Sequence, residues 1–217
     1  MSRHGASAGV GSEPLAPLDN SGRGRSTNAG VTQLTYWRQC LLFSLLLGPD
    51  SVHADILTCR VVGITDGDTI SVVDPANVQH TVRLAAIDAP ESGQPYGSRS
   101  KENLSRLLSD QEVRVDWQKK DSYHRLVGTV WVVSPDMPCR GRSDCPKTLD
   151  AGLAQLTVGL AWHYEKYAHE QEPQKRGQYE FAEIEARAKR AGLWRDPRAV
   201  PPWDWRHPKP AGMDLLW

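Results

Sequence analysis

The chain has 217 residues, a length that suits one domain of ordinary size with additional terminal segments. Hydrophobic residues make up 39% of the sequence and charged residues 24%, which excludes a globally disordered chain. The 26 basic and 26 acidic residues cancel to a net charge of +0, which excludes a protein that binds nucleic acid through bulk positive charge. Any contact with phosphate must therefore come from a local cluster of side chains.

The N-terminal quarter of the chain has the features of a leader and an export signal. Residues 1–35 are rich in Gly, Ser, Ala and Asn without hydrophobic periodicity, so we expect a disordered or non-native leader. Residues 36–54 resemble a signal peptide, because Arg38 precedes an apolar run at 41–47 and a small-x-small site at 52–54. The apolar run is too short for stable membrane insertion.

Cleavage at that site would leave a mature chain that begins at Asp55. We therefore expect an exported protein, either periplasmic or secreted. The alternative is a short buried helix that follows a disordered leader.

The central part of the chain alternates in the manner of β-strands before it becomes helical. Asp66-Gly67 is a hairpin-type turn signal, and the Gly192 that follows the last helical pattern is typical of a helix C-terminus. The order of elements predicts an α+β domain at 55–195, a small β-barrel with packed helices. The Pro- and Trp-rich tail at 196–217 is expected to be extended over it. The predicted strands cover 59–65, 70–73, 79–87, 113–117 and 126–133, and the predicted helices cover 98–108, 149–158 and 174–191.

Three clusters of charged residues lie at the ends of these strands. Asp66 and Asp68 flank a glycine, a pattern that on its own is more often only a turn. Arg83 lies inside an otherwise apolar strand, where an unpaired charge would be costly. Asp88 and Glu91 bracket a proline at the end of that strand, and a third cluster spans 121–125. Loops that leave strands are where functional sites are usually built.

Together these residue types meet the needs of phosphodiester hydrolysis. Two carboxylates and a backbone carbonyl bind a hard divalent cation, which offsets negative charge in the transition state. A further carboxylate positions or deprotonates a water molecule. Two arginines fork onto phosphoryl oxygens, a geometry that lysine does not offer.

The order and spacing of three motifs resemble the staphylococcal nuclease (thermonuclease) family. The motifs are Asp-Gly-Asp-Thr at 66–69, Arg-Leu-x-x-Ile-Asp-x-Pro-Glu at 83–91 and Asp-x-Tyr-x-Arg at 121–125. The resemblance extends over about residues 57–195. It implies a five-stranded OB-fold β-barrel with three packed helices, in agreement with the strands predicted from the residue pattern.

Position by position, the resemblance implies a calcium site and a catalytic carboxylate. Asp68 and Asp88 would be Ca²⁺ ligands, with the carbonyl of Ala89 as the third ligand. Glu91 would be the general base or the residue that orients the attacking water. Asp66 would shape the metal-binding loop.

The resemblance also implies the groups that hold the substrate. Arg83 and Arg125 would clamp the phosphate and stabilise the transition state. Tyr123, together with either Tyr164 or Tyr167, would contact the nucleotide.

Two positions depart from the family pattern, and one segment looks like an insertion. Ser122 replaces a lysine that could add a phosphate contact, and His124 stands where a glycine is expected. The segment at 135–147 looks like an insertion in a strand-to-helix connection. Its two cysteines, Cys139 and Cys145, predict a loop-pinning disulfide in an exported protein. A zinc site is disfavoured, because no fourth ligand lies at a familiar spacing.

The combined reading is a monomeric, exported, calcium-dependent nuclease that hydrolyses DNA and RNA by metal-assisted attack of water. The first alternative is a catalytically silent nuclease-like domain that only binds nucleic acid or a protein partner. The second is a barrel that binds another polyanion or a saccharide. The retained acids and arginines argue against both alternatives.

Overall fold

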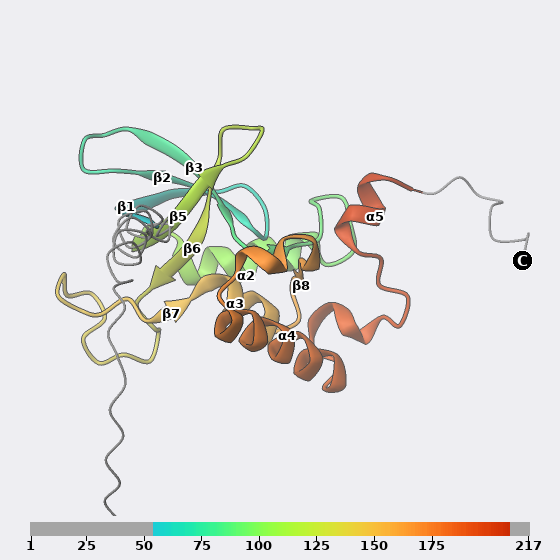
Figure 1. The fold of residues 1–217 in the computed structure, drawn as a ribbon. Coiled ribbons are helices and arrows are strands. Elements are labelled where there is room, and N and C mark those ends of the chain that lie inside the picture. The colour runs from blue at the N-terminus through green and yellow to red at the C-terminus, as the bar shows by residue number, and fades with distance from the viewer. Residues whose placement is uncertain (1–53, 209–217) are drawn as a thin grey trace, which may run out of the picture. The chain divides into compact units, whose positions relative to one another are not determined.

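The computed structural model describes residues 54–208, so the predicted leader at 1–35 and nearly all of the signal segment at 36–54 lie outside the described residues. Figure 1 shows a small barrel of strands with helices gathered at one end of it. No helix within 54–208 has the length and hydrophobicity to cross a membrane. The elements are β1 (Asp55–Ile64), β2 (Thr69–Val73), β3 (Gln79–Leu84), β4 (Ile87–Asp88), α2 (Gly97–Leu108), β5 (Glu112–Lys120), β6 (Leu126–Val132), β7 (Leu149–Asp150), α3 (Ala151–Thr157), β8 (Trp162–His163), η1 (Glu165–Glu170), α4 (Pro173–Ala188), η2 (Gly192–Arg195) and α5 (Pro202–Arg206).

Five strands close into a barrel. β1 pairs antiparallel with both β2 and β5, while β2 pairs with β3 and β5 pairs with β6 in the same sense. A parallel pairing of β3 with β6 closes the ring. The helices α2 and α3 pack against this barrel and α4 packs on α3, and side chains from the barrel and the three helices contribute to one core. The expected five-stranded barrel with three packed helices is therefore confirmed.

The strand predictions hold in the middle of each element and fail at the ends. β6 shows the expected alternation, with every second residue buried from Leu126 to Val132. The predicted strand at 79–87 is broken, because β3 ends at Leu84 and Ala86 adopts a left-handed conformation with φ of 61°. The two residues of β4 then pair with β8 instead of continuing in the barrel. This break turns the chain toward the helical side of the domain.

The last predicted helix ends earlier than its sequence pattern indicates. α4 stops at Ala188, and Arg190 has a φ of 50°, a left-handed conformation that ends the helix. Gly192 lies instead in a close backbone crossing, where Leu193 N donates to Gly159 O at 2.9 Å. A Cβ at Gly159 would lie only 2.4 Å from Ala191 O. Gly192 therefore does adopt a positive φ, as a helix C-terminus would require. The backbone crossing, and not a helix cap, is the reason for a glycine at this position.

The C-terminal tail departs from the extended conformation that we expected. Residues 202–206 form α5, a helix of 5 residues that begins with Pro202 at its first turn. Proline is well suited to that position, since its fixed φ is helical and its missing N–H would have no partner there.

The cysteines of the described residues are either paired or buried. Cys139 and Cys145 form a disulfide, with their Cα atoms 5.4 Å apart. Cys59 in β1 is a free thiol that is 3% exposed. Burial raises its pKa to about 11, with Asp74 and Glu112 adding to the shift. Cys59 therefore serves as a core residue. A thiol with so high a pKa is also a poor nucleophile.

Candidate active site

The first side of the site is the tight turn between β1 and β2. Asp66 Oδ1 accepts a hydrogen bond from Asp68 N at 3.0 Å, which orients the turn. Gly67 is required there, since a Cβ at this position would lie 1.9 Å from Ser100 Oγ in α2. The turn is thus pressed against a helix, and Asp68 points inward with 2% of its surface exposed.

Arg83 joins the two buried aspartates. Its Nη1 lies 2.7 Å from Asp68 Oδ1, and its Nη2 lies 2.8 Å from Asp88 Oδ1. The Asp68 and Asp88 side chains are 3% and 1% exposed, and the Arg83 side chain is 18% exposed. The break after β3 allows this arrangement, because it places Asp88 in β4 beside the arginine five residues earlier. The sequence expectation that Arg83 needs a partner is met by two carboxylates.

The cluster carries more negative charge than its arginines neutralise. Four carboxylates, those of Asp66, Asp68, Asp88 and Glu91, face the two guanidinium groups of Arg83 and Arg206, so 4 − 2 leaves two negative charges when all four carboxylates are ionised. Burial raises the pKa of Asp68 to about 7, and neighbouring Asp66 and Asp88 add to the rise against the opposing effect of Arg83.

The donor atoms and this residual charge fit a hard divalent cation. Within residues 54–208, no group of three or more His, Cys, Asp or Glu side chains converges on one point. A bound cation would therefore need a backbone oxygen and a rearrangement of Arg206 in addition to Asp68 and Asp88.

Arg206 is a site residue that the sequence did not reveal. It extends from α5, and its guanidinium donates to Glu91 Oε1 at 2.5 Å and to Asp88 Oδ2 at 2.7 Å. It lies 115 residues from Glu91, outside the motifs of the family resemblance. A single arginine in a Pro- and Trp-rich tail carries no sequence signal of such a contact.

Arg125 enters the site from the start of β6. Asp121 Oδ1 accepts hydrogen bonds from the backbone N of Tyr123 and of Arg125, and its Oδ2 accepts from Arg125 Nε at 2.7 Å. Burial opposes ionisation of Asp121, but the hydrogen bonds from Arg125 and Tyr123 lower its pKa below the ordinary value. His124 has a φ of 61°, which explains why a glycine is expected at this position.

The three tyrosines differ in their exposure and contacts. Tyr123 is 78% exposed, with the Arg125 guanidinium 5.2 Å from its ring centre. Tyr164 follows β8 and is held by a hydrogen bond from its backbone N to Ala86 O at 2.9 Å. Tyr167 lies edge-on to Tyr164, with ring centres 5.4 Å apart. All three line the same cavity.

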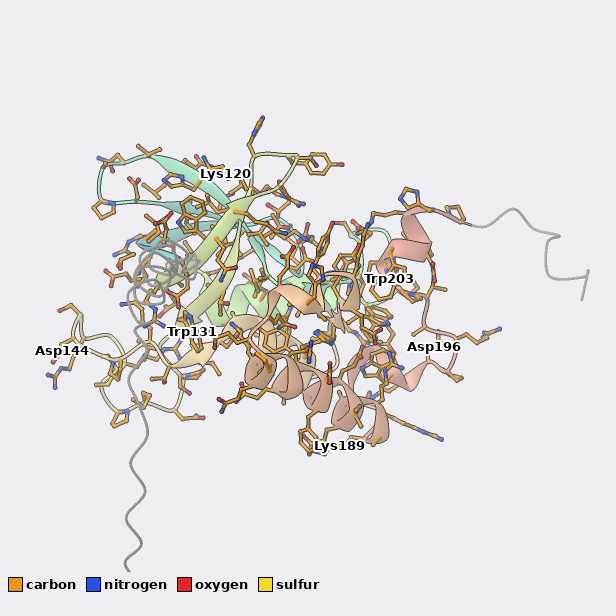
Figure 2. The ribbon with its side chains drawn as sticks, in the orientation of Figure 1. Lys120, Trp131, Asp144, Lys189, Asp196 and Trp203 are labelled. Carbon is orange, nitrogen blue, oxygen red and sulfur yellow. A yellow bond between two sulfur atoms is a disulfide. The ribbon has the colours of Figure 1, made fainter. Side chains whose placement is uncertain are left out.

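One cavity of about 870 Å³ brings these residues together. Asp88 is the exception, because it lies beneath Arg83 and Arg206 instead of on the wall. The disulfide loop does not reach the cavity, and Figure 2 shows Asp144 in that loop on the opposite side of the domain from Trp203. Three lysines that were not among the predicted site residues, Lys119, Lys120 and Lys175, do line it. The expected site residues on its wall are Asp68, Arg83, Ala89, Glu91, Tyr123, Arg125, Tyr164 and Tyr167.

The fold and this site define a class of protein, namely OB-type barrels with a carboxylate cluster and two arginines at one rim. The sequence profile of the family described as "Staphylococcal nuclease homologue" matches residues 81–196. This chain therefore belongs to the staphylococcal nuclease homologue family.

Curated relatives agree with this assignment. Protein ParB of Escherichia coli is 42% identical over 148 residues, which cover 68% of this chain and 77% of the relative. A micrococcal nuclease of Shigella flexneri is 41% identical, covering 68% of this chain and 79% of its own. An uncharacterized endonuclease of Haemophilus influenzae is 35% identical over 179 residues, which cover 81% of this chain and 89% of the relative.

Proposed function

We propose that this protein is a calcium-dependent nuclease that hydrolyses phosphodiester bonds of DNA and RNA. The observation that carries the proposal is the pair of buried aspartates joined through Arg83, with Glu91 and Arg125 in the adjoining cavity. The carboxylates of this cluster outnumber the guanidinium groups that pair with them, and a bound divalent cation would offset the remaining negative charge. The relatives named as micrococcal nuclease and endonuclease support the choice of a nucleic-acid substrate.

Each residue has a defined task in this proposal. Asp68, Asp88 and the carbonyl of Ala89 would hold Ca²⁺, which when bound offsets negative charge on the phosphate. Glu91 accepts a proton from the attacking water or orients it, since its side chain is 37% exposed at the cavity. Arg83 and Arg125 donate to the phosphoryl oxygens, where negative charge develops in the transition state. Tyr123 and one of Tyr164 and Tyr167 contact the nucleotide.

The test is cleavage of single-stranded DNA and of RNA by the mature chain, with added calcium and with excess chelator. We expect cleavage of both substrates with calcium and none with chelator. Undiminished cleavage in chelator would contradict the calcium requirement. Binding without cleavage under every divalent ion would instead favour the silent nuclease-like domain.

The raised pKa of Asp68 predicts that calcium binding depends on pH. The neutral carboxyl is a poor ligand, so protons compete with the ion below the pKa of about 7. We expect the calcium Kd to be about tenfold higher at pH 6 than at pH 8. This factor is the ratio of the ionised fractions of one carboxyl group at the two pH values. Calorimetry in buffers of different ionisation enthalpy should show release of about one proton per ion at pH 6. Equal affinity at both pH values, without proton release, would contradict this role of Asp68.

We further propose that the protein is exported with its signal removed before Asp55. The disulfide between Cys139 and Cys145 supports an oxidising compartment. Cleavage before Asp55 would also leave β1 complete, because that strand begins at Asp55. Mass spectrometry of the protein from the cell envelope and the medium should show Asp55 at or near the N-terminus. An exported protein that keeps residues 1–54, or a protein found only in the cytoplasm, would contradict this expectation.

A further inference from the structure

The C-terminal strap, residues 196–208, follows the last part of the domain that is tied to the core. Leu193 is fully buried, and Trp194 packs edge-on against Trp162 with ring centres 5.3 Å apart. From there the strap crosses toward the loop between β4 and α2. Gln94 Nε2 in that loop donates to Val200 O at 2.5 Å, and Gln94 itself is only 6% exposed. The strap is thus held at a defined point before it reaches the cavity.

Beyond this point the strap covers a tyrosine that the proposed function assigns to the nucleotide. Trp203 stacks on Tyr164, with ring centres 5.4 Å apart and an interplanar angle of 26°. This is the offset stacked arrangement that a nucleobase would adopt on the same ring. Figure 2 shows Trp203 at this end of the domain, beside the helical segments.

The end of the strap occupies the carboxylates themselves. Arg206 contacts both oxygens of Asp88, at 3.3 and 2.7 Å, and Oε1 of Glu91 at 2.5 Å. Asp88 Oδ1 also accepts from Arg83 at 2.8 Å, so both oxygens of Asp88 have a guanidinium partner. Three of the roughly four lone-pair sites of the Asp88 carboxylate therefore accept from guanidinium groups. A divalent cation on Asp88 would lie against the Arg206 guanidinium, which has the same sign of charge, so the two compete for this carboxylate.

The strap is also built to detach. α5 has only 5 residues, and a helix of that length has no stability of its own in water. Arg206 is held mainly by ion pairs, and its own side chain remains 36% exposed, so water competes for its guanidinium. The two prolines at 201 and 202 restrict the backbone, which reduces the entropy lost each time the strap docks.

We propose that the C-terminal strap is a tethered competitor that occupies the active site through Arg206 and Trp203 until a divalent cation displaces it. This inference rests on the proposed calcium-dependent function and adds a form of regulation to it. The site exchanges between a closed form with Arg206 on Asp88 and Glu91, and an open form that binds the ion and exposes Tyr164. The calcium affinity that is measured is lowered by the fraction of closed molecules.

Calcium titration calorimetry on the full mature chain tests this directly, with three variants. Arg206→Gln removes the competing charge, and we expect calcium to bind about tenfold more tightly or better. Trp203→Ala loosens the strap without changing any charge at the carboxylates, and we expect about threefold tighter binding. Arg198→Gln is the matched control, because it removes an exposed charge on the same strap that makes no ion pair within residues 54–208. It should bind calcium as the wild type does.

A second measurement follows the strap itself. Heteronuclear NOE values of the amides at 203–206 should be those of ordered backbone without calcium and should fall when calcium saturates the site. The proposal is overturned if these values do not change, or if Trp203→Ala binds calcium as the wild type does. If only Arg206→Gln binds calcium more tightly, the effect is simple charge repulsion by Arg206, and the strap is not a competitor. Failure of the proposed function has a different signature, in which calcium releases the strap but no variant cleaves nucleic acid.

Discussion

Arg83→Ala should destabilise the fold as well as abolish cleavage. The free energy of unfolding should fall by about 3–5 kcal/mol, the usual cost of removing one partner from a buried ion pair. The cause is that Asp68 would remain buried without a guanidinium partner, while Asp88 would keep only Arg206. Urea denaturation of the mature chain measures this loss. Cleavage should fall by a factor on the order of a hundred or more even in the fraction that is folded.

Arg125→Ala is the matched control, because it removes the other proposed phosphate ligand from a less buried position. Its partner Asp121 has a side chain that is 20% exposed, so water replaces part of the lost contact. We expect a similar loss of cleavage, about a hundredfold or more, with a change in unfolding free energy within about 1 kcal/mol. Equal stability of the two variants would contradict the buried role of Arg83. Cleavage by both near the wild-type rate would show that neither arginine contacts the phosphate.

Glu91→Gln should produce the second large effect, a loss of turnover of about 10²–10⁴-fold, as expected for removal of a general base. The amide keeps the size of the side chain but cannot accept the proton of the attacking water. Since Glu91 is not a proposed calcium ligand, calcium affinity should not fall. Single-turnover cleavage at saturating calcium, together with calcium calorimetry, separates the two effects.

Glu112→Gln supplies the control for Glu91→Gln. Glu112 is a glutamate that is 52% exposed, and it pairs with Lys147 in a part of the domain that does not line the cavity. This variant should cleave at the wild-type rate. Wild-type turnover of Glu91→Gln would exclude Glu91 as the base, and a large loss of calcium affinity would make it a ligand instead.

The sequence by itself determined the barrel and most of the cavity wall. Alternating apolar residues mark the barrel strands because one face of each strand must be buried, and that requirement is local and periodic. Two loops could also be predicted, the turn at Asp66-Gly67-Asp68 and the loop from Asp121 to Arg125. Each is built from hydrogen bonds between residues close in sequence. The pairing of Cys139 with Cys145 could be predicted because these residues are also close in sequence.

The tertiary structure decided how those pieces combine. Periodicity carries no sign of the break at Ala86, because β4 leaves the barrel only to pair with β8, which lies more than seventy residues later. That pairing places Asp88 against Arg83 and brings Tyr164 to the cavity. Arg206 was hidden for a related reason. Its contacts with Asp88 and Glu91 join positions 118 and 115 residues apart, and a sequence records which charges exist but not which distant charge reaches them.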